Sequence, residues 1–199
     1  MKKMFGLLAG LLMAGAVNAQ YLVVEGGGAF SDIGAEKTAQ TLANLSGNTV
    51  TVTYNRGFVT GRVAYGHELD ERFAVEVGYF GASGLKATYE MTGLSATESY
   101  SASGIDFAGI FKPGGGLFVK GGFHSSKLSG AGSITFGGTT YSVSGRIGSG
   151  TGALFGIGYE AELDKSSSVR IGWTRYSSVG GVTSADSDFV YGAYVIKFK

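Results

Sequence analysis

Hydrophobic residues recur at every second position in eight stretches of the chain, and this alternation constrains the fold more than any other feature. Side chains of a β-strand point alternately to its two faces, so the period predicts strands that are apolar on one face. The predicted strands cover residues 20–30, 55–66, 72–82, 99–111, 116–125, 150–160, 168–176 and 188–198. No stretch after Gln20 shows a convincing helical period, so we expect an all-β protein.

The two faces of these strands differ in charge. One face is apolar or aromatic in every strand, and no charged residue interrupts its apolar set, as in Val190, Gly192, Tyr194, Ile196 and Phe198 of the last one. The opposite face carries charged side chains, and one from each strand makes up the set Glu25, Arg62, Glu76, Asp106, Lys120, Glu160, Arg170 and Lys197. These charges sum to zero, and Gly and Ala surround them. This face suits a narrow closed interior, where small residues leave room for long side chains and buried charges must be paired.

The connections between the predicted strands alternate in length. Long polar connections cover residues 31–54, 83–98, 126–149 and 177–187, and short ones cover 67–71, 112–115 and 161–167. Within the long connections, residues 49–54 extend the second strand, and residues 134–143 predict a hairpin that turns at Gly137-Gly138. Long connections at one end and short turns at the other are typical of an eight-stranded, antiparallel, up-and-down transmembrane β-barrel.

Aromatic residues gather at both ends of the apolar face, which is a further indication of membrane insertion. Those near the short turns are Tyr65, Phe73, Phe111, Tyr159 and Phe198, and those near the long connections are Phe30, Tyr79, Phe123 and Trp173. Two such rows are typical of interfacial aromatic girdles. The alternative interpretation is the ordinary preference of strands for aromatic residues.

Residues 1–19 predict a cleaved signal peptide, which leaves residues 20–199 as one barrel domain. Lys2 and Lys3 precede the apolar run 5–17, and Val17-Asn18-Ala19 fits the site that a signal peptidase reads. The formal net charge of +1 and the absence of cysteine give no indication of nucleic-acid binding or of a disulfide framework. We therefore expect export without disulfides.

Two histidines raise the question of catalysis or metal binding. His124 and Ser126 have a His-x-Ser spacing that places both side chains on one face of a strand, as a catalytic pair would require. That face is the inward one, whereas a lipid substrate would arrive from outside the barrel. His67 precedes Glu68, Asp70 and Glu71 in a predicted turn, where a solvated loop is a simpler interpretation than a metal site. We expect no catalytic residue, no metal and no cofactor.

The eight strands, the loop asymmetry and the closing residues 194–198 resemble the eight-stranded outer-membrane barrels, the OmpA transmembrane-domain and opacity-protein superfamily. The resemblance covers residues 20–199. It implies that Tyr194, Ile196 and Phe198 form the insertion signal read by the barrel-assembly machinery, although Lys199 follows the terminal aromatic here. It also implies a salt-bridge network among the interior charges Glu25, Arg62, Glu76, Asp106 and Lys120.

These features together predict a monomeric protein of the bacterial outer membrane. Its expected partners are outer-membrane lipids and lipopolysaccharide, the assembly machinery, and an extracellular ligand of the long loops, with no nucleic acid. The expected role is structural or surface-presenting, including adhesion. A narrow porin-like channel is the second hypothesis, and a lipid A-modifying enzyme is the third.

Overall fold

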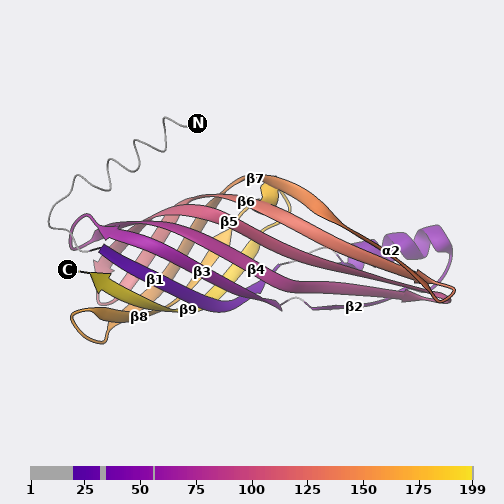
Figure 1. Ribbon diagram of the computed structural model, residues 1–199, viewed down its shortest axis with the longest axis horizontal. Coiled ribbons are helices and arrows are strands. Elements are labelled where there is room, and N and C mark those ends of the chain that lie inside the picture. Colours follow the sequence, from indigo (N-terminus) through magenta and orange to yellow (C-terminus); the bar gives the residue numbers. More distant parts are fainter. Residues whose placement is uncertain (1–19, 32–34, 56, 199) are drawn as a thin grey trace.

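The computed structural model describes residues 20–31, 35–55 and 57–198, whose strands form a closed antiparallel ring with a long extension at one end (Figure 1). The eight strands of the ring are β1 (Gln20–Phe30), β3 (Gly57–Glu68), β4 (Phe73–Met91), β5 (Leu94–Gly114), β6 (Leu117–Phe136), β7 (Thr139–Glu162), β8 (Ser167–Tyr176) and β9 (Ser187–Phe198). Each pairs with the next along the chain, and β1 pairs with β9. The predicted fold class is confirmed.

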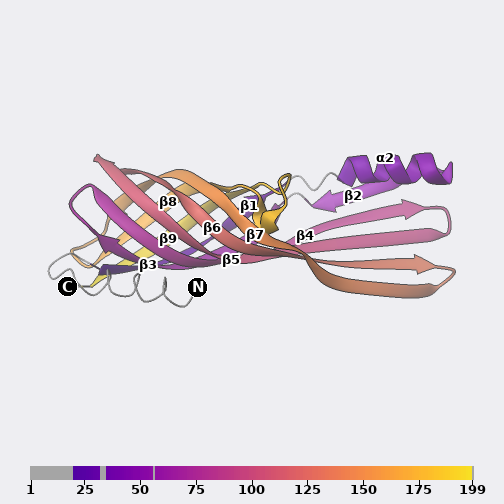
Figure 2. The same cartoon turned by 90° about the horizontal axis from the view of Figure 1, so that it is seen from above.

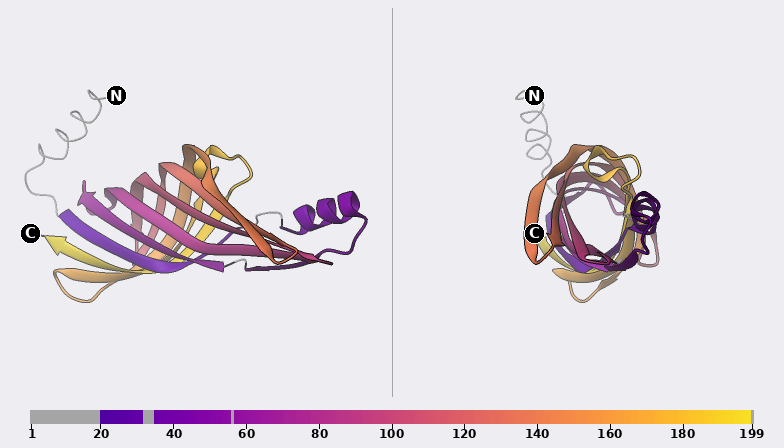
Figure 3. Two further views of the ribbon diagram at one scale, coloured as in Figure 1. Left: turned by 45° about the vertical axis from the view of Figure 1, so that its right-hand side comes forward. Right: turned by 90° about the vertical axis from the view of Figure 1, so that its right-hand side faces the viewer.

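Pairing of β1 with β9 closes the ring over the whole length of β1. The register runs from Gln20 opposite Phe198 to Phe30 opposite Asp188. The end-on view in Figure 3 shows the resulting circle of strands. Closure removes the free edges of the sheet and satisfies its backbone hydrogen bonds internally, which strands need in a hydrocarbon environment.

The alternation along the strands separates an apolar outside from a buried inside. In β9, Val190 is 50% and Tyr194 is 46% exposed, whereas Tyr191 and Val195 between and beyond them are buried. The same division holds around the ring, where the exposed apolar residues include Val24, Val63, Phe73, Ile105, Val119, Phe155, Ile157 and Ile171. We call this outward surface the apolar belt. Within the described residues, no helix is long and apolar enough to cross a membrane.

Beyond the ring, β4 to β7 continue as two paired hairpins, which lie spread beside each other in Figure 2. The prediction of long connections over 83–98 and 126–149 was therefore wrong in structure, because most of these residues are strand. The predicted turn at Gly137-Gly138 is confirmed, with φ of 56° and 82° that glycine adopts without strain. We call these hairpins, together with the elements packed beside them, the extension.

One helix, α2 (Ala35–Ser46), and one short strand, β2 (Thr51–Asn55), complete the extension. The helix contradicts the all-strand expectation. Ala35, Ala39 and Leu42 have the i, i+4, i+7 spacing of a helix face and pack with Tyr89 of β4, but alanine gives a weak hydrophobic signal. The predicted extension of the second strand is a separate strand, β2, which pairs with β4 beyond the end of β3.

The short turns join the strands at the other end of the ring. In the turn between β7 and β8, hydrogen bonds from Ser166, and then from Ser167, lower the pKa of the Asp164 carboxyl to about 2. Asp70 similarly accepts hydrogen bonds from the backbone N–H groups of Arg72 and Phe73 between β3 and β4. These carboxylates stabilise tight turns by satisfying backbone donors.

Candidate functional site

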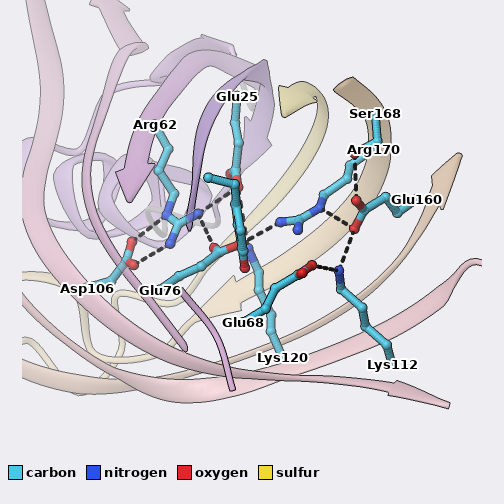
Figure 4. Close-up of polar contacts among 11 residues, drawn as sticks. Glu25, Arg62, Glu68, Glu76, Asp106, Lys112, Lys120, Glu160, Ser168 and Arg170 are labelled. Atoms are coloured by element: carbon cyan, nitrogen blue, oxygen red, sulfur yellow. Dashed lines mark hydrogen bonds and ion pairs between the residues drawn. The ribbon is translucent and has the colours of Figure 1, made fainter. Parts of the chain in front are cut away.

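Arg62 on β3 is the centre of a buried charge network inside the ring (Figure 4). Its Nε and Nη2 donate to the two carboxylate oxygens of Asp106 at 2.8 and 2.7 Å. Its Nη1 lies 2.7 Å from Oε1 of Glu25 and 2.9 Å from Oε2 of Glu76. One guanidinium therefore joins carboxylates from β1, β4 and β5 with the planar geometry that favours such contacts.

Arg170 on β8 forms a second centre, nearer the short turns. Its Nη1 lies 2.6 Å from Oε1 of Glu76 and its Nε lies 2.9 Å from Oε2 of Glu160, so Glu76 bridges the two arginines. Ser168 donates to the other oxygen of Glu160 at 2.6 Å. The Arg170 guanidinium also lies 5.2 Å from the ring centroid of Tyr21, a distance at which a cation interacts with an aromatic ring.

Lysine and tyrosine side chains complete the network. Lys120 lies 3.9 Å from Glu25 and 4.7 Å from the ring centroid of Tyr191. The Tyr21 hydroxyl donates to Glu76, and the Tyr176 hydroxyl donates to Asp106, each at 3.1 Å. The lumen at this level is thus filled by paired charges and their hydrogen-bond partners.

The structure places the eight charges of the inward face unequally. Seven of them, Glu25, Arg62, Glu76, Asp106, Lys120, Glu160 and Arg170, are buried in the network. Lys197 differs, because its ammonium pairs at 2.7 Å with Glu162, whose side chain is 74% exposed at the rim.

Sequence reasoning missed two members of the network, Glu68 and Lys112. Lys112 lies 3.2 Å from Glu68 and 3.3 Å from Glu160. The sequence pattern assigns both to turns, although each lies an even number of residues from an inward charge of its own strand. Because β3 and β5 continue past their predicted ends, the alternation of side chains also continues and points Glu68 and Lys112 into the short-turn end of the lumen.

An aromatic layer closes the lumen above the charges, toward the extension. The ring centroid of Phe80 lies 4.6 Å from that of Tyr176 and 6.0 Å from that of Phe189, and Phe58 contacts Phe189 edge-on at 6.5 Å. These rings are buried. Because Tyr176 also donates to Asp106, the aromatic layer and the charge network form one continuous filling.

The two histidines hold structural positions. His124 packs edge-on against Phe80 and its Nε2 lies 2.9 Å from the carbonyl oxygen of Ser177, while Ser126 accepts a hydrogen bond from the N–H of Gly180. Both side chains are buried. His67 lies at the end of β3 and not in the predicted turn. Across the described residues, no group of three or more His, Asp or Glu side chains is arranged to hold a metal ion.

A closed eight-stranded antiparallel barrel, apolar outside and filled with paired charges, is the architecture that these observations define. No protein-family model and no curated protein sequence matches this chain. Among solved structures, it is similar to the attachment invasion locus protein Ail of Yersinia pestis, with a TM-score of 0.50, 10% identity, and coverage of 92% of this chain and 100% of that chain. The complex of Ail with the heparin analogue sucrose octasulfate gives a TM-score of 0.51 at 10% identity, with the same coverage.

Neisserial surface protein A matches with a TM-score of 0.43 and 13% identity, over 90% of this chain and 99% of that chain. The similarity to Ail concerns the fold. It confirms that the chain has the fold of the eight-stranded outer-membrane barrels, as the resemblance in the sequence implied.

Proposed function

We propose that this chain is an integral protein of a bacterial outer membrane whose plugged barrel presents the extension to the outside of the cell. The apolar belt supports the membrane location, because a closed ring with an apolar outer surface and a charged interior is suited to lipid. The similarity to the fold of Ail agrees with this location. Residues 1–19, proposed as the export signal, lie outside the described residues.

The filled lumen is the observation that favours a platform over a channel. The network around Arg62 and Arg170 spans the interior from β1 to β8. The aromatic layer of Phe80, Tyr176 and Phe189 also lies across the interior. Ion flow would require these buried pairs to separate, and leaving a buried charge without its partner costs several kcal/mol.

The buried positions of His124 and Ser126 favour a non-enzymatic role over lipid A modification. Both side chains point into the lumen and form hydrogen bonds with the β8–β9 connection. A lipid substrate would meet the opposite, apolar face of β6. The geometry of His124 and Ser126 therefore does not support the hypothesis of a lipid A-modifying enzyme.

The outward row of β9 supports its proposed role as the insertion signal. Tyr194, Ile196 and Phe198 are 46%, 37% and 45% exposed on the outer surface. This row is accessible to the assembly machinery, whereas the inward residues of β9 are not. The extension is the part of the molecule that an extracellular ligand would contact. As a monomer, the ring would expose its whole apolar belt to lipid and lipopolysaccharide.

Heat-modifiable gel mobility tests the membrane barrel directly. We expect residues 20–199, refolded in detergent, to migrate differently in unheated and in boiled samples, because a closed barrel resists unfolding by the gel detergent until it is heated. Circular dichroism of the unheated sample should show β-structure. A protein that remains soluble and folded without detergent would contradict the proposal.

Conductance in planar bilayers tests the plugged lumen. We expect no steady single-channel openings from the native protein. Replacing Glu76 with Gln or Lys120 with Met should add brief openings to a silent baseline, because each substitution removes one partner of a buried ion pair. Steady openings of the native protein that change in size with either substitution would support the channel hypothesis and overturn the platform.

A further inference from the structure

A cavity of about 460 Å³ lies above the aromatic layer, where the ring passes into the extension. Its volume falls within the range of about 300–1,000 Å³ that is usual for small-molecule sites. The lining residues come from the ring, the extension and the β8–β9 connection. They include Lys37, Phe58, Leu85, Tyr100, Leu128 and Val179.

The wall of the cavity is apolar, with a few polar groups. Leu85 and Val179 are buried and belong to the hydrophobic cluster of the ring, and the partly buried Tyr100 and Ala102 pack against that cluster. Most of the polar residues in the lining are serines. Lys37 of α2 carries the only charge among the described lining residues. A site of this composition suits an apolar ligand with one anionic or hydroxyl group.

The floor of the cavity separates it from the charge network. Phe58 lines the cavity and contacts Phe189, which packs in turn on Tyr176 at 4.7 Å. These rings lie between the cavity and the carboxylates below. A ligand would therefore enter from the extension and stop at the aromatic layer, so binding requires no passage through the lumen.

Exposed apolar side chains lie on the hairpin of β6 and β7, on the strands that continue beyond the cavity. Ile134 and Tyr141 lie opposite each other in the register and are 49% and 67% exposed, and Phe136 is 65% exposed. Gly130 shares the alternating face of Ile134 and Phe136, and a Cβ at Gly130 would lie 2.7 Å from the Cδ1 atom of Ile147, which lines the cavity. Such a row outside the lipid-facing ring is unusual for a surface that contacts only water.

We propose that this cavity binds a single-chain anionic amphiphile, a carboxylate with an aliphatic chain, which reaches it along the β6–β7 hairpin. The chain packs among Leu85, Leu128 and Val179, and the carboxylate lies toward Lys37. This site is independent of the platform role, because a barrel that conducts ions could still bind a ligand above its aromatic layer.

Methyl NMR of the full domain in lipid nanodiscs, titrated with octanoate and separately with octanol, tests the site. We expect saturable shifts of the methyl signals of Leu85, Leu128, Ile147 and Val179 with both probes. Lys37→Met should weaken octanoate binding about two- to fivefold, the effect of one exposed charge pair, and leave octanol binding unchanged. Equal effects of Lys37→Met on both probes would overturn the role of the carboxylate.

Replacing two alanines by phenylalanine, one inside the cavity and one outside it, locates the binding site. Ala185→Phe places a ring in the cavity and should abolish the saturable shifts, whereas Ala131→Phe, at an exposed position of β6 outside the lining, should preserve them. Gel mobility before and after heating verifies that both variants fold. Shifts confined to the apolar belt, or shifts that persist in a folded Ala185→Phe variant, would overturn the site.

Discussion

Replacement of Arg62 by Met is expected to cause the largest loss of stability of any single change in the interior. The substitution leaves Glu25, Glu76 and Asp106 buried without the cation that contacts all three. Removing one partner of a buried ion pair costs about 3–5 kcal/mol, and here three carboxylates lose a contact. We expect a lower urea midpoint for unfolding in lipid vesicles, or no heat-modifiable band at all.

Two comparisons separate the loss of charge pairing from the loss of packing. Arg175→Met removes a bidentate contact with Asp188 at the partly exposed outer end of β8, so it should cost only a small fraction of the Arg62 effect. Adding Asp106→Asn and Glu25→Gln to Arg62→Met should restore part of the stability, because fewer unpaired charges remain. A folded, fully stable Arg62→Met protein would contradict the view that this network organises the interior.

An arginine placed on the apolar belt should show where the membrane lies. Val63 is 50% exposed on β3, beside the level of Arg62 and opposite Val24 of β1. Val63→Arg would place a charge near the middle of the hydrocarbon layer, at a cost of about 2–4 kcal/mol. The expected result is a lower free energy of unfolding in vesicles and a reduced yield of folded protein.

The matched control for Val63 is Val143 in the extension. Val143 is 74% exposed on β7, outside the proposed bilayer, so Val143→Arg should change stability by no more than about 0.5 kcal/mol. A similar cost at both positions would contradict the placement of the membrane around the ring alone. A similar tolerance at both would contradict membrane insertion itself.

The ring could be predicted from the sequence because burial on one face of each strand leaves a period of two. Strand β1 has the predicted bounds 20–30, and parity placed Glu25 and Arg62 on the side that the structure buries. Individual pairings could not be predicted. Arg62 reaches three strands across the lumen, and the tilt and stagger of the strands decide which carboxylates lie within its reach.

The extension was harder to predict, since its strands depend on neighbours more than on burial. Residues 126–133 and 142–149 are mostly Ser and Gly, which alternate weakly. Their β-conformation continues the hydrogen-bond ladder that begins inside the ring. The helix α2 was missed because its buried face uses the alanines 35 and 39, and Glu68 and Lys112 were missed because the strand ends were placed too early.

The pairing of β1 with β9 has a consequence for how the molecule forms. The two strands that close the ring are separated by almost the entire sequence, so the final contacts have very high contact order. Ring closure costs a large loop entropy before the hydrogen bonds between β1 and β9 can form and offset it. Until then, β1 is an open edge that can pair with other chains. Assembly is therefore expected to be slow and all-or-none, and a chain that lacks β9 should aggregate and not form a smaller barrel.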